Sequence, residues 1–295
     1  MKSSVVSYPH RGHYGNNLYR GNCTGHIIKD FINQYLSNPN GMVTDPSIGG
    51  LTFMDVCSEL GVRHTGLDLH QGYNLLTTDL ARTVGEESNL VWWHPPYWDI
   101  IQYSGDQWGQ EANPWDMSRM DLDGFIESLY LSISNINDAV ETGGHFGILM
   151  GNVRKNGVYY NLSSLIERIS SSPLVDEVIK VQHNCVSDSR QYRGNLVRIA
   201  HEKLLVFRKS RPSLSLPNLV QLRFENQTRI TWSVVVRRAV MMKGGKDVPL
   251  SDIYDVVEPY AEKTSNNHWK AKIRQVVQDT RYFARQELGV YSLIN

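Results

Sequence analysis

The stretch VWWHPPYWD, residues 91–99, combines two prolines, four aromatic rings and a histidine. Proline cannot continue a sheet ladder, so residues 94–97 are predicted to leave a hydrophobic strand as a stiff, extended turn. Such a turn holds its neighbours at fixed positions, among them one ionisable acceptor, His94. A rigid turn of rings with one acceptor indicates a pocket for a flat ligand.

Two acidic residues upstream, 23 positions apart, indicate what else binds nearby. Asp45 and Pro46 end a predicted strand, and Gly49 and Gly50 follow just before a predicted helix. This arrangement lets the backbone approach a ligand closely while amides at the helix start face it. Asp68 ends the next predicted strand, where an acidic residue accepts hydrogen bonds from ribose hydroxyls. The pair predicts an adenosine-containing ligand, either a dinucleotide or S-adenosylmethionine.

The His-Pro-Pro-Tyr turn favours methyl transfer to an exocyclic amine over hydride transfer. The amino nitrogen of adenine or cytosine is a poor nucleophile because its lone pair is delocalised into the ring. If His94 and the Pro95 carbonyl accept its two N–H protons, the lone pair is aimed at a sulfonium methyl. Tyr97 then stacks on the base once it has been extruded from the duplex.

These motifs resemble those of the amino-group DNA methyltransferases, which modify N6 of adenine or N4 of cytosine. The family's fourth motif, (D/N/S)PPY, corresponds to HPPY at 94–97, and its first, DPFxGSGT, is similar to 45–52 with a shortened glycine turn. Its acidic second motif aligns with Asp68, and 201–209 resembles its last motifs. The motif order is similar to the gamma-type arrangement, and the resemblance covers about residues 19–209.

The resemblance implies S-adenosyl-L-methionine as cofactor and double-stranded DNA as partner, with N6 of adenine as the favoured target. No metal is expected, since displacement at a sulfonium needs alignment rather than a Lewis acid. The implied catalytic residues are His94, Pro95, Pro96 and Tyr97. The implied cofactor contacts are Arg20, Asn22, Thr24, Asp45, Pro46, Ser47, Gly49, Gly50, Asp68 and Asp79. An N4-cytosine enzyme, a catalytically silent DNA-binding regulator and an RNA methyltransferase remain alternatives.

His94 departs from the Asp, Asn or Ser of the family motif. A neutral imidazole has one acceptor nitrogen and imidazolium has none. We therefore expect activity to fall on acidification through the histidine pKa, about 6.5 for an unperturbed group.

The elements around these motifs predict an α/β fold. Residues 41–209 alternate short apolar runs with amphipathic segments, the pattern of a mostly parallel sheet flanked by helices. The expected strands are 41–45, 64–69, 89–93, 145–152, 178–184 and 202–209, and the expected helices are 51–61, 120–144 and 160–172. This predicts a Rossmann-like methyltransferase sheet over residues 1–209.

The sequence pattern changes after residue 209. Residues 210–228 contain two prolines without clear periodicity and are predicted to be a linker. Residues 229–295 are predicted to form three helices and a two-stranded wing, which resembles the winged helix-turn-helix modules attached to restriction-modification proteins. The basic helix 267–278 is expected to contact DNA phosphates, although a solvated face of a protein-interaction domain is the alternative. The candidate DNA contacts are Trp98, Arg190, Arg193, Trp269, Lys270, Lys272 and Arg274.

One long polar connection, residues 101–119, is expected to close over the base or contact DNA.

Composition adds little about partners. The 30 basic and 30 acidic residues balance, but residues 229–295 carry 11 Lys and Arg against 7 Asp and Glu, a basic excess. Three scattered cysteines form neither a disulfide framework nor a zinc spacing. Because no apolar window has the length of a signal peptide or a membrane span, a cytoplasmic protein is expected.

Overall fold

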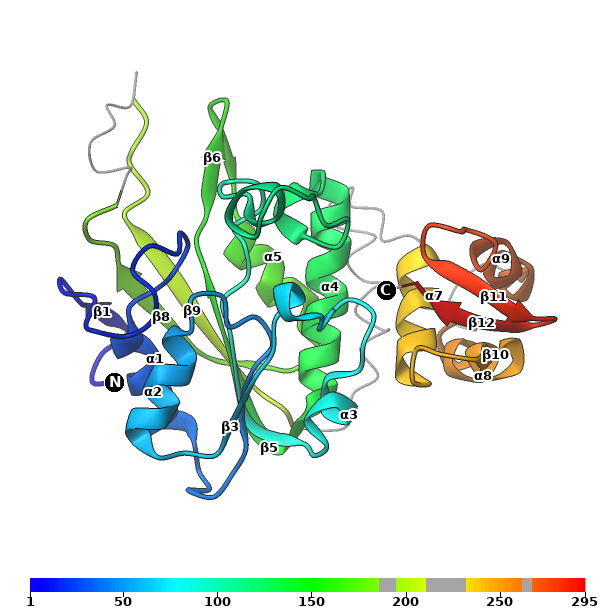
Figure 1. The fold of residues 1–295 in the computed structure, drawn as a ribbon, viewed down its shortest axis with the longest axis horizontal. Coiled ribbons are helices and arrows are strands. Elements are labelled where there is room, and N and C mark those ends of the chain that lie inside the picture. The colour runs from blue at the N-terminus through cyan, green and yellow to red at the C-terminus, as the bar shows by residue number, and fades with distance from the viewer. Residues whose placement is uncertain (186–194, 211–231, 262–266, 295) are drawn as a thin grey trace.

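The computed structural model describes residues 1–185, 195–210, 232–261 and 267–294. Within these residues a seven-stranded sheet forms the centre of the protein (Figure 1). In sheet order its strands are β1 (Val5–Ser7), β8 (Leu174–Val181), β9 (His201–Arg208), β5 (Val140–Met150), β4 (Ser88–Trp93), β2 (Val43–Asp45) and β3 (His64–Gly66). The predicted α/β class with a largely parallel sheet is confirmed.

Strand β9 is the exception to the parallel arrangement, since it runs antiparallel to both β5 and β8. The other neighbouring pairs in this sheet are parallel. The reversed direction brings the first residues of β9 to the edge at which β4 and β5 end. Residues far apart in the sequence therefore meet at that edge.

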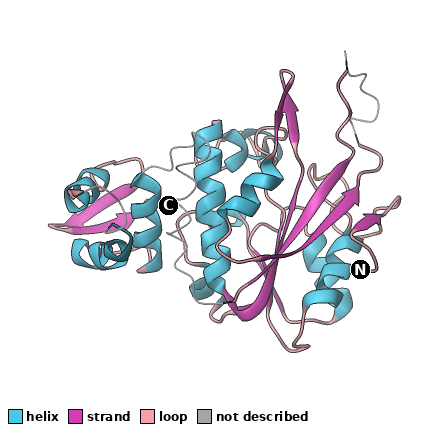
Figure 2. Ribbon diagram, turned by 180° about the vertical axis from the view of Figure 1, so that it is seen from behind, coloured by secondary structure: helices cyan, strands magenta, loops and turns pink. Residues whose placement is uncertain are grey.

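Helices cover both faces of the sheet (Figure 2). One face carries α1 (Gly25–Tyr35) and α2 (Thr52–Leu60), and the other carries α3 (Leu80–Val84), α4 (Leu122–Ala139) and α5 (Leu162–Ile169). Every residue of β4 is buried. Trp92 packs into the core beneath α1 and Trp93 into the core beneath α4, because neighbouring side chains on a strand point to opposite faces.

The structure shifts one predicted boundary and adds elements that were not predicted. The helix expected over 120–144 ends at Ala139, and β5 begins at Val140, which pairs with Ser88 of β4. A hairpin of β6 (Val153–Lys155) and β7 (Val158–Tyr160) follows β5. Short helical turns cover Leu69–Gln71, Tyr103–Gln107 and Met117–Arg119.

The C-terminal part of the chain forms a second, smaller unit. Its helices are α7 (Trp232–Met242), α8 (Leu250–Ala261) and α9 (Trp269–Val276), and its antiparallel sheet has the order β10 (Val248–Pro249), β12 (Val290–Leu293) and β11 (Phe283–Glu287). Three helices and the β11–β12 pair were predicted, whereas the short strand β10 was not. The predicted linker, apart from residue 210, lies outside the described residues.

Two consecutive arginines of α7 join this unit to α4. Arg238 is 1% exposed and pairs with Asp138, while Arg237 is 4% exposed and its Nη2 donates to Glu127 Oε2 at 2.8 Å. The guanidinium of Arg237 also lies 4.2 Å from the ring centre of Tyr282. Burial lowers the pKa of Arg238 to about 10, so it remains charged at neutral pH. The contact between the units therefore includes buried ion pairs beside a shared apolar core.

In the described part of the chain, no helix has both the length and the apolar character needed to cross a membrane.

Candidate active site

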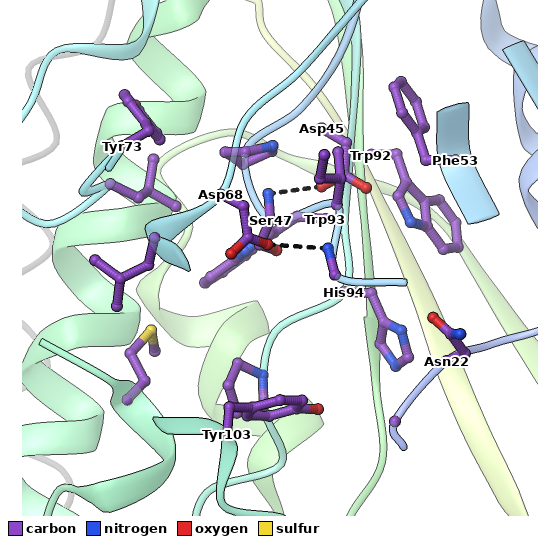
Figure 3. A pocket seen from close by; sticks show the side chains of 18 of the residues that line it. Asn22, Asp45, Ser47, Phe53, Asp68, Tyr73, Trp92, Trp93, His94 and Tyr103 are labelled. Atoms are coloured by element: carbon purple, nitrogen blue, oxygen red, sulfur yellow. Dashed lines mark hydrogen bonds between the residues drawn. The ribbon is translucent and has the colours of Figure 1, made fainter. Parts of the chain in front are cut away.

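A cavity of about 880 Å³, including its open mouth, lies at the edge where β2, β3 and β4 end (Figure 3). Carboxyl ends of parallel strands meet at one edge, so the turns after these strands face a common space. Its lining includes, from the predicted residues, Asn22, Asp45, Pro46, Ser47, Gly49, Asp68, His94 and Pro96. Both predicted motifs therefore reach the same cavity.

The turn after β2 is held by the carboxylate of Asp45. Asp45 is 3% exposed, and its Oδ1 accepts a hydrogen bond from the Ser47 backbone N–H at 2.8 Å. Burial raises the pKa of Asp45 well above its usual range. Asp45 thus shapes the turn.

Asp68 joins this turn to the end of β3. One of its carboxylate oxygens accepts from the Gly49 N–H and the other from the His70 N–H, each at 2.9 Å. Figure 3 shows the Asp68 carboxylate beside the glycine turn, facing the cavity. Burial raises the pKa of Asp68. Hydrogen-bond donors from a ligand would favour its ionised form.

Three buried polar atoms in the lining lack a protein hydrogen-bond partner among the described residues. They are Ser47 Oγ, Thr52 Oγ1 and Asn74 Nδ2. Buried polar groups are normally hydrogen-bonded, so unpaired atoms beside a cavity indicate a polar ligand or ordered water. Together with the buried acid Asp68, these atoms fit a ligand that carries several hydroxyl, amino or carboxylate groups.

The upstream segment contributes Asn22 to the lining. A Cβ at Gly50 would lie 2.3 Å from Asn22 Nδ2, so only glycine permits this approach. Arg20 and Thr24, which were predicted beside Asn22, have other contacts. Arg20 lies 3.8 Å from Asp106, and Thr24 caps α1 through the His26 N–H.

Aromatic residues that sequence reasoning missed close one side of the cavity. Tyr19 stacks on Tyr103 with ring centres 5.8 Å apart, and its hydroxyl accepts from Trp108 Nε1 at 3.1 Å. The Trp108 ring stacks in turn on His70. Three of these residues, Tyr19, Tyr103 and Trp108, line the cavity. The connection 101–119 therefore forms part of the wall, and its unusual aromatic content was the signal available in the sequence.

The turn after β4 places His94 in the cavity. His94 Nε2 lies 2.8 Å from the Tyr97 hydroxyl, which donates to Glu202 Oε1 at 2.8 Å. Pro96 lines the cavity as well, and Pro95 beside it is buried. Tyr97 itself packs behind His94, and a Cβ at Gly151 would lie only 2.5 Å from its ring. The predicted pair of His94 and Tyr97 is thus linked by a hydrogen bond.

Burial lowers the pKa of His94 to about 4, only partly offset by the nearby Glu202 carboxylate. The value near 6.5 applies to an unperturbed imidazole, and burial moves the pKa of His94 below it. His94 is therefore neutral, with one acceptor nitrogen, at physiological pH.

Several predicted residues do not line the cavity: Arg20, Thr24, Gly50, Asp79, Pro95, Tyr97 and Trp98. Asp79 instead caps α3, where its carboxylate accepts from the Arg82 N–H at 2.9 Å. Trp98 is 8% exposed, and its indole N–H donates to the Met120 carbonyl oxygen at 3.1 Å. The Lys155 ammonium lies 4.4 Å from the Trp98 ring centre. Asp79 and Trp98 therefore make contacts within the fold and do not reach the cavity.

Of the other candidate DNA contacts, the structure describes the four on α9. Arg190 and Arg193 lie outside the described residues. Lys270 and Arg274 are exposed on α9 one helical turn apart. Lys272, between them, is partly buried, and Trp269 packs against Tyr254.

No group of three or more His, Cys, Asp and Glu side chains within the described ranges has the arrangement of a metal site.

Comparison with known proteins gives weak similarities only. No protein-family model matches the chain, and no curated protein does. Among solved structures, TrmN from Thermus thermophilus is 11% identical with a TM-score of 0.35, over 64% of this chain and 50% of that chain. A TehB-like SAM-dependent methyltransferase from Corynebacterium glutamicum is 15% identical with a TM-score of 0.37, over 66% and 90% of the two chains. A putative DNA modification methylase from Thermus thermophilus, complexed with S-adenosyl-L-methionine, is 16% identical with a TM-score of 0.32, over 62% and 84%. This chain spans about half the length of TrmN.

Proposed function

We propose that this chain is an S-adenosyl-L-methionine-dependent DNA methyltransferase that modifies the exocyclic amine of a flipped base, N6 of adenine in preference to N4 of cytosine. The observation that carries the proposal is that the Asp45 turn, Asp68 and the His94–Pro96 turn line one cavity of about 880 Å³. An acid suited to ribose and an acceptor suited to an amine thus face the same space.

The residues that hold the methyl donor are those of the acidic turn. Asp68 accepts the ribose hydroxyls, and the unpaired polar atoms of Ser47, Thr52 and Asn74 are available to the other polar groups. When bound, the sulfonium supplies an electrophilic methyl group. The aromatic rings of Tyr103 and Trp108 would shield one side of the bound groups from water.

The residues that handle the substrate amine are those of the His94 turn. The neutral imidazole and the Pro95 carbonyl accept the two N–H groups, which directs the nitrogen lone pair at the methyl carbon. The aromatic surface of the cavity suits a base that has left its stack. These groups would act by alignment: as the nitrogen–methyl bond formed, the sulfur–methyl bond would break to leave a neutral thioether, and the methylated nitrogen would release one proton to solvent.

The proposed DNA partner rests on the C-terminal unit. Its order of α7, β10, α8, α9 and the β11–β12 pair is compatible with a winged helix-turn-helix module, in which α9 would be the recognition helix. Exposed Lys270 and Arg274 on α9 supply charge for phosphates.

The test is to incubate the purified full chain with methyl-labelled S-adenosyl-L-methionine and either duplex DNA or RNA of mixed sequence, then digest and quantify the modified nucleosides. N6-methyladenine in DNA is the expected product. N4-methylcytosine in DNA would identify cytosine as the target base. Label in RNA would identify RNA as the substrate. DNA binding without any label would identify the protein as a catalytically silent regulator.

Replacing Asp68 with asparagine is expected to weaken binding of S-adenosyl-L-methionine by about 10- to 100-fold, since charge-assisted hydrogen bonds contribute about 1.5–3 kcal/mol. Titration calorimetry without DNA measures this directly. Asp121→Asn is the matched control, because Asp121 caps α4 away from the cavity. Equal affinity for the parent and Asp68→Asn proteins would remove Asp68 from the site.

The rate of methyl transfer is expected to stay level through the ordinary histidine range and to fall only as the pH approaches about 4. The lowered pKa means that protonation, which removes the acceptor lone pair of His94, occurs at lower pH than in a free histidine. Single-turnover rates across this range measure the effect, with circular dichroism at each pH to exclude unfolding. A midpoint near the unperturbed value of about 6.5 would contradict it.

A further inference from the structure

Two oppositely charged side chains meet at the sheet edge where the His94 turn leaves β4. Lys180, near the end of β8, and Glu202, at the start of β9, are directly opposite one another in the sheet. Lys180 Nζ lies 2.5 Å from Glu202 Oε2, and the two side chains are 10% and 9% exposed. Burial favours a neutral Glu202, but Lys180 and the other surrounding groups together outweigh it and lower the pKa of the carboxyl. Glu202 is therefore an ionised acceptor.

Tyr97 connects this ion pair to His94. Its hydroxyl oxygen lies 2.8 Å from Glu202 Oε1 and 2.8 Å from His94 Nε2. A hydroxyl has one proton, and an ionised carboxylate can only accept, so this proton is donated to Glu202. The hydroxyl oxygen must then accept from His94, which requires a proton on Nε2. In a neutral imidazole, Nδ1 is left with the lone pair.

We propose that Lys180, Glu202 and Tyr97 are positioning residues that fix His94 as its Nε2–H tautomer and hold the Nδ1 lone pair ready for the substrate amine. The inference rests on the proposed function of His94 as an acceptor. His94 lines the cavity (Figure 3), and its Nδ1 has no hydrogen-bond partner in the described part of the protein.

The reason for such a network lies in the chemistry of the amine. An exocyclic amine bound at this site donates N–H groups, so a histidine that presents an N–H of its own opposes it. Aspartate, which has acceptors alone, does not have this difficulty, whereas imidazole has one donor and one acceptor that exchange places. A fixed acceptor on the Nε2 side removes the wrong tautomer and also restrains rotation of the ring.

The Tyr97 ring is held independently of its hydroxyl. Gly151, just after β5, allows the ring to lie against the backbone, since a Cβ there would be 2.5 Å from Tyr97 Cε2. Tyr97→Phe therefore keeps the ring packing and removes only the oxygen that accepts from His94. This makes the substitution a specific probe of the hydrogen bond.

The first test reads the tautomer without DNA or methyl donor. In protein labelled with ¹⁵N-histidine, near neutral pH, we expect the His94 signals to show a protonated Nε2 and an unprotonated Nδ1. The signals are assigned by their loss in His94→Asn. Tyr97→Phe and Glu202→Gln are both expected to mix the tautomers, because the glutamine amide offers Tyr97 either an oxygen or an N–H.

The second test measures single-turnover methyl transfer in a double-mutant cycle. Tyr97→Phe is expected to slow transfer by about 10- to 100-fold, the scale of one unpaired buried group. In a His94→Asp background the same change is expected to cost less than about threefold, because an ionised carboxylate has acceptors alone and leaves no tautomer to be fixed. Tyr35→Phe is the matched control, since Tyr35 donates to Asp176 at 2.7 Å on another part of the sheet.

The two measurements separate the possible failures. A wild-type His94 protonated on Nδ1, or equal losses from Tyr97→Phe in both backgrounds, would overturn the positioning role even in an active enzyme. The expected tautomer in a protein that methylates no nucleic acid would instead overturn the proposed function.

Discussion

Replacing His94 with alanine is expected to slow single-turnover methyl transfer by about 10²- to 10³-fold, the scale of removing one group that aligns or stabilises a reacting centre. The imidazole is the one side chain of the turn with an acceptor at the cavity, and alanine leaves an amine N–H unpaired. Affinity for S-adenosyl-L-methionine should change little, because Asp68 and the glycine turn lie on other strands.

The comparison for this variant is His64→Ala. His64 is also a partly buried histidine, but it begins β3 at the opposite edge of the sheet, where its Nδ1 lies 2.9 Å from the Val62 carbonyl oxygen. Equal rates for both alanine variants, with unchanged melting temperatures, would exclude an acceptor role for His94.

The second large effect concerns stability. Asp138→Ala is expected to lower the free energy of unfolding by about 3 kcal/mol, because it leaves Arg238 charged and buried between α4 and α7. This lies at the low end of the range for breaking a buried pair, since the Asp138 side chain is 31% exposed whereas that of Arg238 is 1% exposed. Urea titration followed by circular dichroism measures the change.

Removing the buried positive charge of Arg238 should lower the free energy of unfolding by less than removing Asp138. Arg238→Met replaces the buried cation with an apolar side chain, and the double variant Asp138→Ala, Arg238→Met should be more stable than Asp138→Ala alone. Asp279→Ala breaks an ion pair whose partner Arg281 is 76% exposed, so it should cost less than about 1 kcal/mol. An Asp138 effect as small as that of Asp279 would show that the buried pair does not stabilise the contact between the units.

Strands and helices were predictable where local pattern alone decides them. The apolar run 89–93 is β4 within one residue, and the helix expected over 51–61 is α2 at Thr52–Leu60. The end of α4 was not predictable in the same way. Gly143 and Gly144 suggested a helix stop, but Val140 already pairs with Ser88, a contact that no local pattern encodes.

The candidate site likewise combines residues that local pattern places with residues that only tertiary pairing places. Asp45, Asp68 and His94 each follow a predicted strand, so their meeting at one sheet edge follows from parallel topology. Lys180 and Glu202 are single charged residues in strands, and their role depends on the register between β8 and β9. That register is set by tertiary pairing, which the sequence of either strand alone does not specify.

Arg237 and Arg238 also show the limit of composition. Both add to the basic excess of residues 229–295, which suggested phosphate contacts, yet both are buried against α4. Counting charges does not distinguish a cation that faces solvent from one that joins two packed helices. Exposed Lys270 and Arg274 remain the candidates on α9.

The antiparallel course of β9 has a consequence for the order in which the protein folds. The contacts that shape the acidic turn close short loops, with Asp45 bonded two residues away and Asp68 bonded to Gly49 across 19 residues. The bond from Tyr97 to Glu202 spans 105 residues and requires β9 to be in place. Long loops close at greater entropic cost and form later. We therefore expect a partly folded chain to form the Asp45 turn before the hydrogen bond from Tyr97 to Glu202 orients His94.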